Sequence, residues 1–134
     1  NSLILNQGNF GTNSGTMTLT YTGSNNSHTM NMATTSDTSN YVFTLQAIGN
    51  YNNITNTINS KYTNDTFTIT GNRNNVTTTQ LGFNGTANAP GHYINTSIIG
   101  DNNTLSIRQD GTTMANRVTL NVTGSGTSTT ILQH

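Results

Sequence analysis

The chain has 134 residues, of which 30% are hydrophobic and 6% charged, and its formal net charge is zero. It has no basic stripe that could follow a phosphate backbone, so we expect no nucleic-acid partner. It also lacks the run of roughly 20 apolar residues that a membrane helix needs, so we expect no membrane insertion. The absence of cysteine excludes disulfides and thiol metal ligands. The first residue is Asn1 rather than Met, as expected of a processed protein or an excerpt.

A short alternation of apolar and polar residues followed by a tight turn recurs along the chain, which is the pattern of a strand with one buried face. The copies lie, in chain order, at residues 17–21, 43–47, 67–69, 94–98 and 118–122. The turns that follow them begin at Gly23, Gly49, Gly71, Gly100 and Gly124. By subtraction, these glycines are 26, 22, 29 and 24 residues apart. A repeat of this length predicts a solenoid.

A second alternating strand follows each turn, with inward positions five, seven and nine residues after the glycine. The chain's opening residues, including Leu3 and Leu5, read as the same strand from a turn whose first half is missing. The last inward position is glutamine in four of the six copies, at Gln7, Gln80, Gln109 and Gln133, and is Met32 or Ile58 in the other two. A buried amide is costly unless it is paired, and stacked copies can pair along a ladder. We therefore predict a core glutamine ladder.

The connections between strands differ at the two edges. The glycine turns are short and rich in Gly and Asn, which tolerate positive φ, whereas the return connections at 33–40, 59–65, 81–93 and 110–116 vary in length. The longest contains Pro90 and is predicted to form a protrusion that contacts a neighbour or a ligand. Together the patterns predict one all-β domain over residues 1–134. It is a β-solenoid of about five and a half two-strand rungs, with two parallel in-register sheets and a thin core.

The titratable residues do not form a catalytic pattern. There is no Glu, and the four aspartates, Asp37, Asp65, Asp101 and Asp110, are expected in turns or loops, where Asp bonds to its own backbone. His28 falls at an inward position, His92 in the long loop and His134 at the end of the chain. Because no acid and base are placed together, we predict no enzyme activity, no metal site and no cofactor.

The surface is rich in hydroxyls and amides. Thr-x-Thr arrays at 16–22 and 66–70 resemble the flat threonine ranks of ice-binding β-solenoids, but the matching outward positions of other rungs include Gln46, Asn95 and Asn121. Eight Asn-x-Ser/Thr sequons, no more than the composition predicts, offer sites for glycan attachment or contact; they begin at Asn25, Asn53, Asn64, Asn75, Asn84, Asn95, Asn102 and Asn121.

Three segments, 1–13, 75–85 and 103–111, each contain an alternating strand, a glutamine and a glycine-containing turn. They resemble halves of the curlin repeat of bacterial curli, whose units contain two short strands, glutamines and a Gly/Asn-rich turn. The rungs here are longer, and the first strand of each lacks the second glutamine of the family. The resemblance implies a secreted β-solenoid that stacks end to end into an extracellular fibre.

We therefore expect a structural subunit of an extracellular curli-like fibre that assembles with copies of itself, head to tail. The strand with Thr129 and Ile131 reaches the end of the chain as a regular rung strand, and the strand with Leu3 and Leu5 starts in mid-rung. Both are expected to be uncapped edges where subunits join. The alternatives are a β-solenoid segment of a phage tail fibre or surface adhesin, and a Thr-rich ice-binding protein.

Overall fold

The strands form because β-branched, aromatic and threonine residues alternate between a buried and an outward face. The computed structural model describes residues 1–7, 14–32, 40–59, 64–81, 92–110 and 116–134, and these contain eleven strands and no helix. One set is β1 (Ser2–Gln7), β3 (Ser27–Met32), β5 (Asn53–Asn59), β7 (Asn75–Leu81), β9 (Thr104–Asp110) and β11 (Ser128–Gln133). The other is β2 (Ser14–Thr22), β4 (Asn40–Ile48), β6 (Asn64–Thr70), β8 (Tyr93–Ile99) and β10 (Arg117–Thr123).

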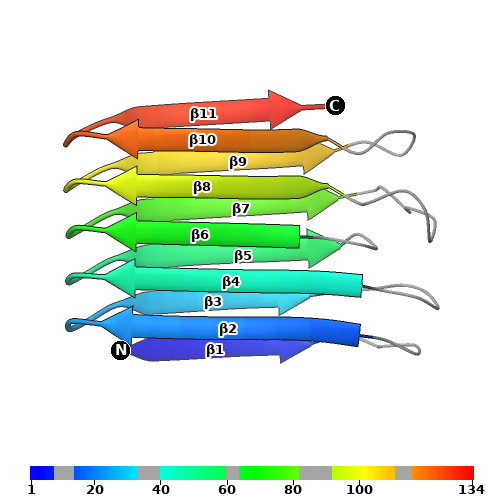
Figure 1. The fold of residues 1–134 in the computed structure, drawn as a ribbon, viewed down its shortest axis with the longest axis horizontal. Helices are drawn as coiled ribbons and strands as arrows, with labels where there is room; N and C mark the ends of the chain where they lie inside the picture. Colours follow the sequence, from blue (N-terminus) through cyan, green and yellow to red (C-terminus); the bar gives the residue numbers. More distant parts are fainter. Residues whose placement is uncertain (8–13, 33–39, 60–63, 82–91, 111–115) are drawn as a thin grey trace.

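The two sets form two parallel sheets that face each other. The first has six strands in the order β1-β3-β5-β7-β9-β11, and the second has five in the order β10-β8-β6-β4-β2. The chain climbs the stack by crossing from one sheet to the other at each turn, with β1 at one end and β11 at the other (Figure 1). The predicted β-solenoid with two parallel sheets is thus confirmed, and eleven strands at two per rung give the expected five and a half rungs.

The register is uniform through the stack. In the six-stranded sheet, Ile54 pairs with Val76 and Val76 with Leu105, and in the five-stranded sheet Leu45 pairs with Phe67. Equivalent residues of successive rungs therefore form columns along the stack axis. The positions predicted five, seven and nine residues after each turn glycine are the inward columns of the six-stranded sheet.

The core between the sheets is thin and built from these columns. Its fully buried apolar side chains come from both sheets, and Phe67, Met30 and Leu45 are the largest. The other buried apolar residues of the described part are Ala47, Ile54, Ile69, Val76, Ile94, Ile98, Leu105, Ile107, Val118 and Val122. Polar side chains share this interior, among them Asn56, Asp65, Thr78, Gln80 and Gln109.

The expected protrusion around Pro90 lies outside the described residues, as do the centres of the other return connections. The first strands of the rungs are longer than their alternation predicts. β6, for example, begins at Asn64 rather than Phe67, because its backbone pairs with β4 and β8 over that whole length.

Candidate functional site

The spacing of the stack requires a glycine at the turns that begin with Gly23, Gly49, Gly71 and Gly100. Gly71 has a φ of 135°, a conformation that residues with a Cβ rarely adopt. A Cβ on Gly71 would also overlap the carbonyl oxygen of Gly100 in the next rung, and the same holds for Gly23, Gly49 and Gly100. Gly124 differs, because nothing lies within 4 Å of the place where its Cβ would be. The turns therefore stack with direct backbone contact.

A buried asparagine ladder runs beside these glycines. Its members lie three residues after each turn glycine, at Asn26, Asn52, Asn74 and Asn103, with Asn1 below them and Thr127 above. Each Oδ1 accepts a hydrogen bond from the backbone N–H of the next member, as at 3.0 Å from Asn103 N to Asn74 Oδ1. Each Nδ2 donates to the carbonyl of the turn glycine of the next rung, as at 2.8 Å from Asn74 to Gly100. This ladder satisfies backbone groups that the turn would otherwise bury unpaired.

The asparagine ladder was missed in the sequence, where the turn asparagines were interpreted only as residues that tolerate positive φ. The signal was present, because asparagine recurs at the third position after four successive glycines. A second ladder occupies the first position after the glycine: Ser24, Asn50, Asn72, Asp101 and Ser125. Here the backbone N–H of each member bonds to the side-chain oxygen of the next, as at 2.6 Å from Asn72 N to Asp101 Oδ1.

Three of the four predicted glutamines stack along one inward column. Gln80 Nε2 donates to Gln109 Oε1 at 3.0 Å, and Gln109 Nε2 donates to Gln133 Oε1 at 2.9 Å. Gln109 also donates to the carbonyl of Tyr93, at 3.1 Å. The backbone of Gln7 lies in the same column, separated from Gln80 by Met32 and Ile58. The side chain of Gln7 lies outside the described part of the structure, and the effect of the ladder on assembly stays a prediction.

The residues predicted at the assembly ends lie on the first and last strands of the six-stranded sheet. Leu3 and Leu5 on β1 are in register with His28 and Met30. At the other end, Thr129 and Ile131 on β11 are half-buried and in register with Leu105 and Ile107. Their contact with a second copy stays a prediction.

The prediction that every aspartate lies in a turn or loop is wrong for Asp65. Asp65 is the second residue of β6 and is completely buried, in register with Phe43 on β4 and Ile94 on β8. Asn56 Nδ2, across the core, donates to its Oδ2 at 3.4 Å. Burial raises the pKa of Asp65 to about 7, although the side chains of Asn56 and Gln80 favour the ionised form. Asp65 was misplaced because β6 was predicted to begin at Phe67.

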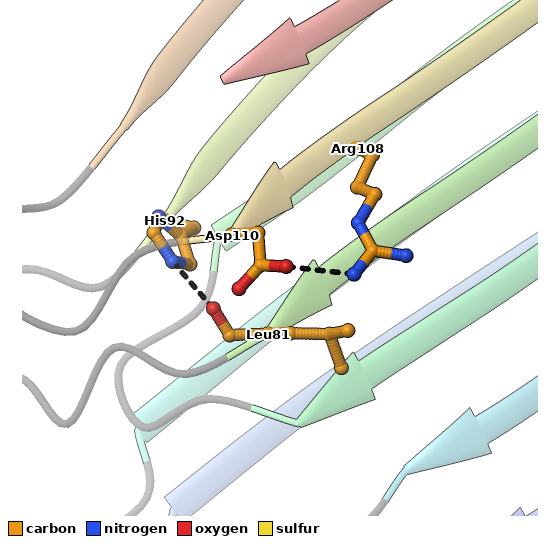
Figure 2. A network of polar contacts seen from close by, with 4 residues as sticks. All are labelled: Leu81, His92, Arg108 and Asp110. Carbon is orange, nitrogen blue, oxygen red and sulfur yellow. Dashed lines mark hydrogen bonds and ion pairs between the residues drawn. The ribbon is translucent and has the colours of Figure 1, made fainter. Parts of the chain in front are cut away.

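Asp110 is also in a strand, as the last residue of β9, while Asp101 lies in a turn as expected and Asp37 falls outside the described residues. Figure 2 shows the ion pair between Asp110 and Arg108, with 2.7 Å between Oδ2 and the guanidinium nitrogen. The hydrogen bond from Arg108 lowers the pKa of Asp110. Both side chains are substantially exposed, so the pair contributes little to stability.

His92, expected in the long loop, lies directly before β8 and is completely buried. Its Nδ1 accepts a hydrogen bond of 3.0 Å from the backbone N–H of Asn116, which leaves the ring proton on Nε2. That nitrogen is 3.1 Å from the carbonyl oxygen of Leu81 and donates to it (Figure 2). The imidazole thus joins the loop edges of three successive rungs, which is a structural use of histidine.

His28 is inward and buried, as its position predicts, and its ring centroid lies 6.4 Å from that of Tyr21 across the core. Burial lowers the pKa of His28 to about 4 and raises that of Tyr21 to about 12. Both groups are therefore neutral in the folded chain at neutral pH.

A regular hydroxyl column, also missed in the sequence, lies on the outward face of the six-stranded sheet. It consists of Thr29, Thr55, Thr77, Ser106 and Thr130, one residue from each of β3, β5, β7, β9 and β11. The predicted threonine rows belong to the other sheet, where asparagine, serine and glutamine interrupt them. The column lies on the second strand of each rung, whereas the threonine rows predicted from the sequence lie on the first.

No cluster of three His, Cys, Asp or Glu side chains suited to a metal ion is found among the described residues. In the same part of the chain, no helix has the length and apolarity to span a membrane. Comparisons with protein-family models, with curated proteins and with solved structures give no match. The polar ladders run parallel to the stack axis through the described rungs.

Proposed function

We propose that the chain is the structural subunit of an extracellular, curli-like fibre, and that subunits stack head to tail through the six-stranded sheet. The observation that carries the proposal is the uniform pairing of that sheet. Thr104 N donates to Thr127 O in the same way that Ser27 N donates to Asn52 O and Ser2 N to Asn26 O. The outer edge of β11 therefore presents the same backbone N–H and C=O groups to a further strand that β9 presents to β11.

The pairing also defines which groups face the joint. Successive backbone amides of a strand point to opposite neighbours, and the carbonyl of Thr127 is directed toward β9. Ser128, Thr130 and Leu132 therefore direct their N–H groups away from β9. In the register of the internal strands, Ser128 N would donate to Asn1 O of the next subunit. This contact joins two different surfaces and does not close, which yields a filament.

The glutamine column supports the same joint. From β1 to β11 the column contains Gln7, Met32, Ile58, Gln80, Gln109 and Gln133. With β1 of the next subunit placed on β11, Gln7 of that subunit follows Gln133. The three glutamines that are hydrogen-bonded in one chain then continue into a fourth.

The five-stranded sheet has one strand fewer than the six-stranded sheet. This joint therefore leaves an empty strand position between β10 of one subunit and β2 of the next. That position is open to a further segment in a continuous fibre. The extracellular location and a biofilm or cell-surface role are part of the proposal and rest on the resemblance to the curlin repeat. Glycans are proposed as surface partners because the outward faces present hydroxyls and amides.

The test is electron microscopy and sedimentation of the purified chain at rising concentration, for the natural sequence and for two variants at Thr130. Thr130→Pro removes an N–H that faces the joint and leaves the pairing with β9 intact. Thr130→Ala keeps that N–H and is the matched control. Ile131→Pro would be a less selective test of the joint. The Ile131 N–H faces β9, so its loss would also weaken pairing within the chain.

We expect filaments from the natural chain and from Thr130→Ala. Thr130→Pro should stay soluble, with circular dichroism typical of β structure. Normal filaments from Thr130→Pro would contradict pairing through β11. A natural chain that stays monomeric at every concentration would contradict the fibre proposal itself, and a closed trimer would favour the tail-fibre or adhesin alternative.

The outward hydroxyl column favours a second candidate, ice binding. Its five side chains repeat at the strand spacing of about 4.8 Å, and Thr57 and Thr79 extend the array to a second column over two rungs. This function requires that the face order water as a lattice. Growth of ice crystals in the presence of the chain would test it: unchanged crystal shape excludes the candidate, and faceting that Thr77→Lys abolishes supports it.

A further inference from the structure

Asp65 lies where two runs of side-chain hydrogen bonds meet in the core. In the first run, Thr78 Oγ1 donates to Asn56 Oδ1 at 2.9 Å, and Asn56 Nδ2 donates to Asp65 Oδ2. All three residues are completely buried. The run ends at Asp65, whose other oxygen, Oδ1, is buried and has no hydrogen-bond partner among the described residues.

The second run begins at Gln80, whose side chain is near the Asp65 carboxyl and favours its ionised form. It proceeds through Gln109 and Gln133, and Gln133 Nε2 donates to the carbonyl of Arg117 at 3.3 Å. The Oε1 atom of Gln80 is likewise buried without a hydrogen-bond partner in the described structure. Both unpaired atoms, Asp65 Oδ1 and Gln80 Oε1, are acceptors, so a bond between them needs a proton that neither carries when Asp65 is ionised.

We propose that Asp65 is a proton-binding site in the solenoid core, and that the neutral carboxyl joins the two runs by donating from Oδ1 to Gln80 Oε1. The proton comes from solvent and is taken up when the chain folds. The result is one chain of donors and acceptors with a single direction, from Thr78 through Asn56, Asp65, Gln80, Gln109 and Gln133 to the Arg117 carbonyl. It begins on β7, in the middle of the stack, and ends at the Arg117 carbonyl on β10, which accepts from Gln133 of β11.

Among the residues that the structure describes, the groups around Asp65 offer no countercharge that would hold it ionised. Across the core it faces Asn56 on β5 and Gln80 on β7, two strands without a titratable residue. In its own sheet β4 carries Tyr41, and β8 carries Tyr93 on the outward side, where its ring contacts Arg117. The buried His92 before β8 is bound to Leu81 and Asn116 rather than to Asp65. The raised pKa of Asp65 is consistent with its burial among these uncharged side chains.

Proton binding makes folding dependent on pH. The pKa of Asp65 is raised in the folded chain from its ordinary value of 3.8 to about 7. The stability that the bound proton contributes is therefore complete below pH 3.8 and is lost as the pH rises to about 7. The folded-to-unfolded ratio is expected to fall about tenfold per pH unit across that window, through this one group. Above about pH 7, Asp65 no longer makes the folded-to-unfolded ratio depend on pH.

The test is ¹³C NMR of the soluble chain labelled at the aspartate carboxyls, titrated from pH 4 to pH 9. In Asp65→Asn the Asp65 carboxyl signal is missing, which identifies that signal in the natural chain. The asparagine amide also provides a hydrogen-bond donor and an acceptor at every pH. Asp101→Asn is the matched control, because asparagine already occupies that ladder position in the two rungs below. We expect one carboxyl to remain protonated above pH 6, and that signal to be missing only from Asp65→Asn.

Urea unfolding of the same three proteins gives an independent result. The natural chain and Asp101→Asn should share one dependence on pH, and Asp65→Asn should gain stability relative to both as pH rises from 4 to 7. An Asp65 carboxyl that is ionised at pH 5 overturns the proposal, and so does an Asp65→Asn profile parallel to that of the natural chain. Neither measurement depends on filament formation.

Discussion

Replacing Asn74 by alanine tests whether the buried asparagine ladder, rather than apolar packing, holds the turns together. The side chain of Asn74 accepts from Asn103 N and donates to Gly100 O. Both groups would lose these partners in Asn74→Ala, and Asn103 is completely buried. Asn52 Oδ1 would keep its bond from the backbone N–H of Asn74.

The expected loss of stability follows from those two groups. A buried polar group left without a partner costs about 1–3 kcal/mol, so two such groups cost roughly 2–6 kcal/mol. The lower half of that range applies because Gly100 is only half-buried. A typical domain is stable by about 5–15 kcal/mol, so the variant loses a substantial part of its stability.

The adjacent residue provides the control. Asn75 is exposed, and its side chain only accepts from Asn53 Nδ2 at 3.2 Å on the outer surface. Asn75→Ala should change the free energy of unfolding by less than about 0.5 kcal/mol. Urea unfolding followed by circular dichroism measures both variants under one condition. A loss from Asn74→Ala no larger than that from Asn75→Ala would refute the ladder as a source of stability.

Three further predictions use the same unfolding assay. Gly71→Ala should destabilise the chain much more than Gly124→Ala, because both glycines have positive φ but only the Gly71 Cβ would meet the next rung; equal losses would mean that φ alone matters. Gln109→Ala should cost about 1–3 kcal/mol by unpairing its ladder neighbours, whereas Gln46→Ala on the outward face should cost under about 0.5 kcal/mol, and the reverse order would contradict the inward assignment. For His28, whose pKa is lowered in the folded chain, stability is present above the ordinary value of 6.5 and is lost as pH falls to about 4. In an Asp65→Asn background, His28→Gln should abolish this acid-side loss, and an unchanged slope would mean that His28 is not its source.

The fold could be predicted from the sequence because two periods are superimposed in it. Alternation within each strand identifies the buried face, and the turn glycines identify where each rung repeats. Counting from those glycines aligns His28, Ile54 and Val76, and the backbone pairs them in that register. In a parallel stack one register applies to all rungs, so a correct alignment of the turns places every strand of the six-stranded sheet.

The predicted location is wrong for Asp65, a polar residue in an inward column of the stack. Asp65 has the sequence context of a loop, between Asn64 and Thr66 and shortly after a variable connection. Only the pairing of β6 with both neighbours extends the strand far enough to bury it. The hydrogen bond from Asn56 and the contact with Gln80 come from the opposite sheet, and no local sequence pattern predicts such a contact.

The polar ladders also explain how so little apolar sequence defines one register. Because polar side chains such as Asn56 and Gln80 share the interior, the two faces of a strand differ less in hydrophobicity than in an ordinary sheet. A slip of one residue in such a strand would cost correspondingly little in apolar burial. It would, however, move Asn74 away from Gly100 and Gln80 away from Gln109, and so leave buried groups unpaired in two separate columns at once. Because each ladder penalises the slip independently, their costs add. The columns that define register within the chain would impose the same register on a second copy stacked upon it.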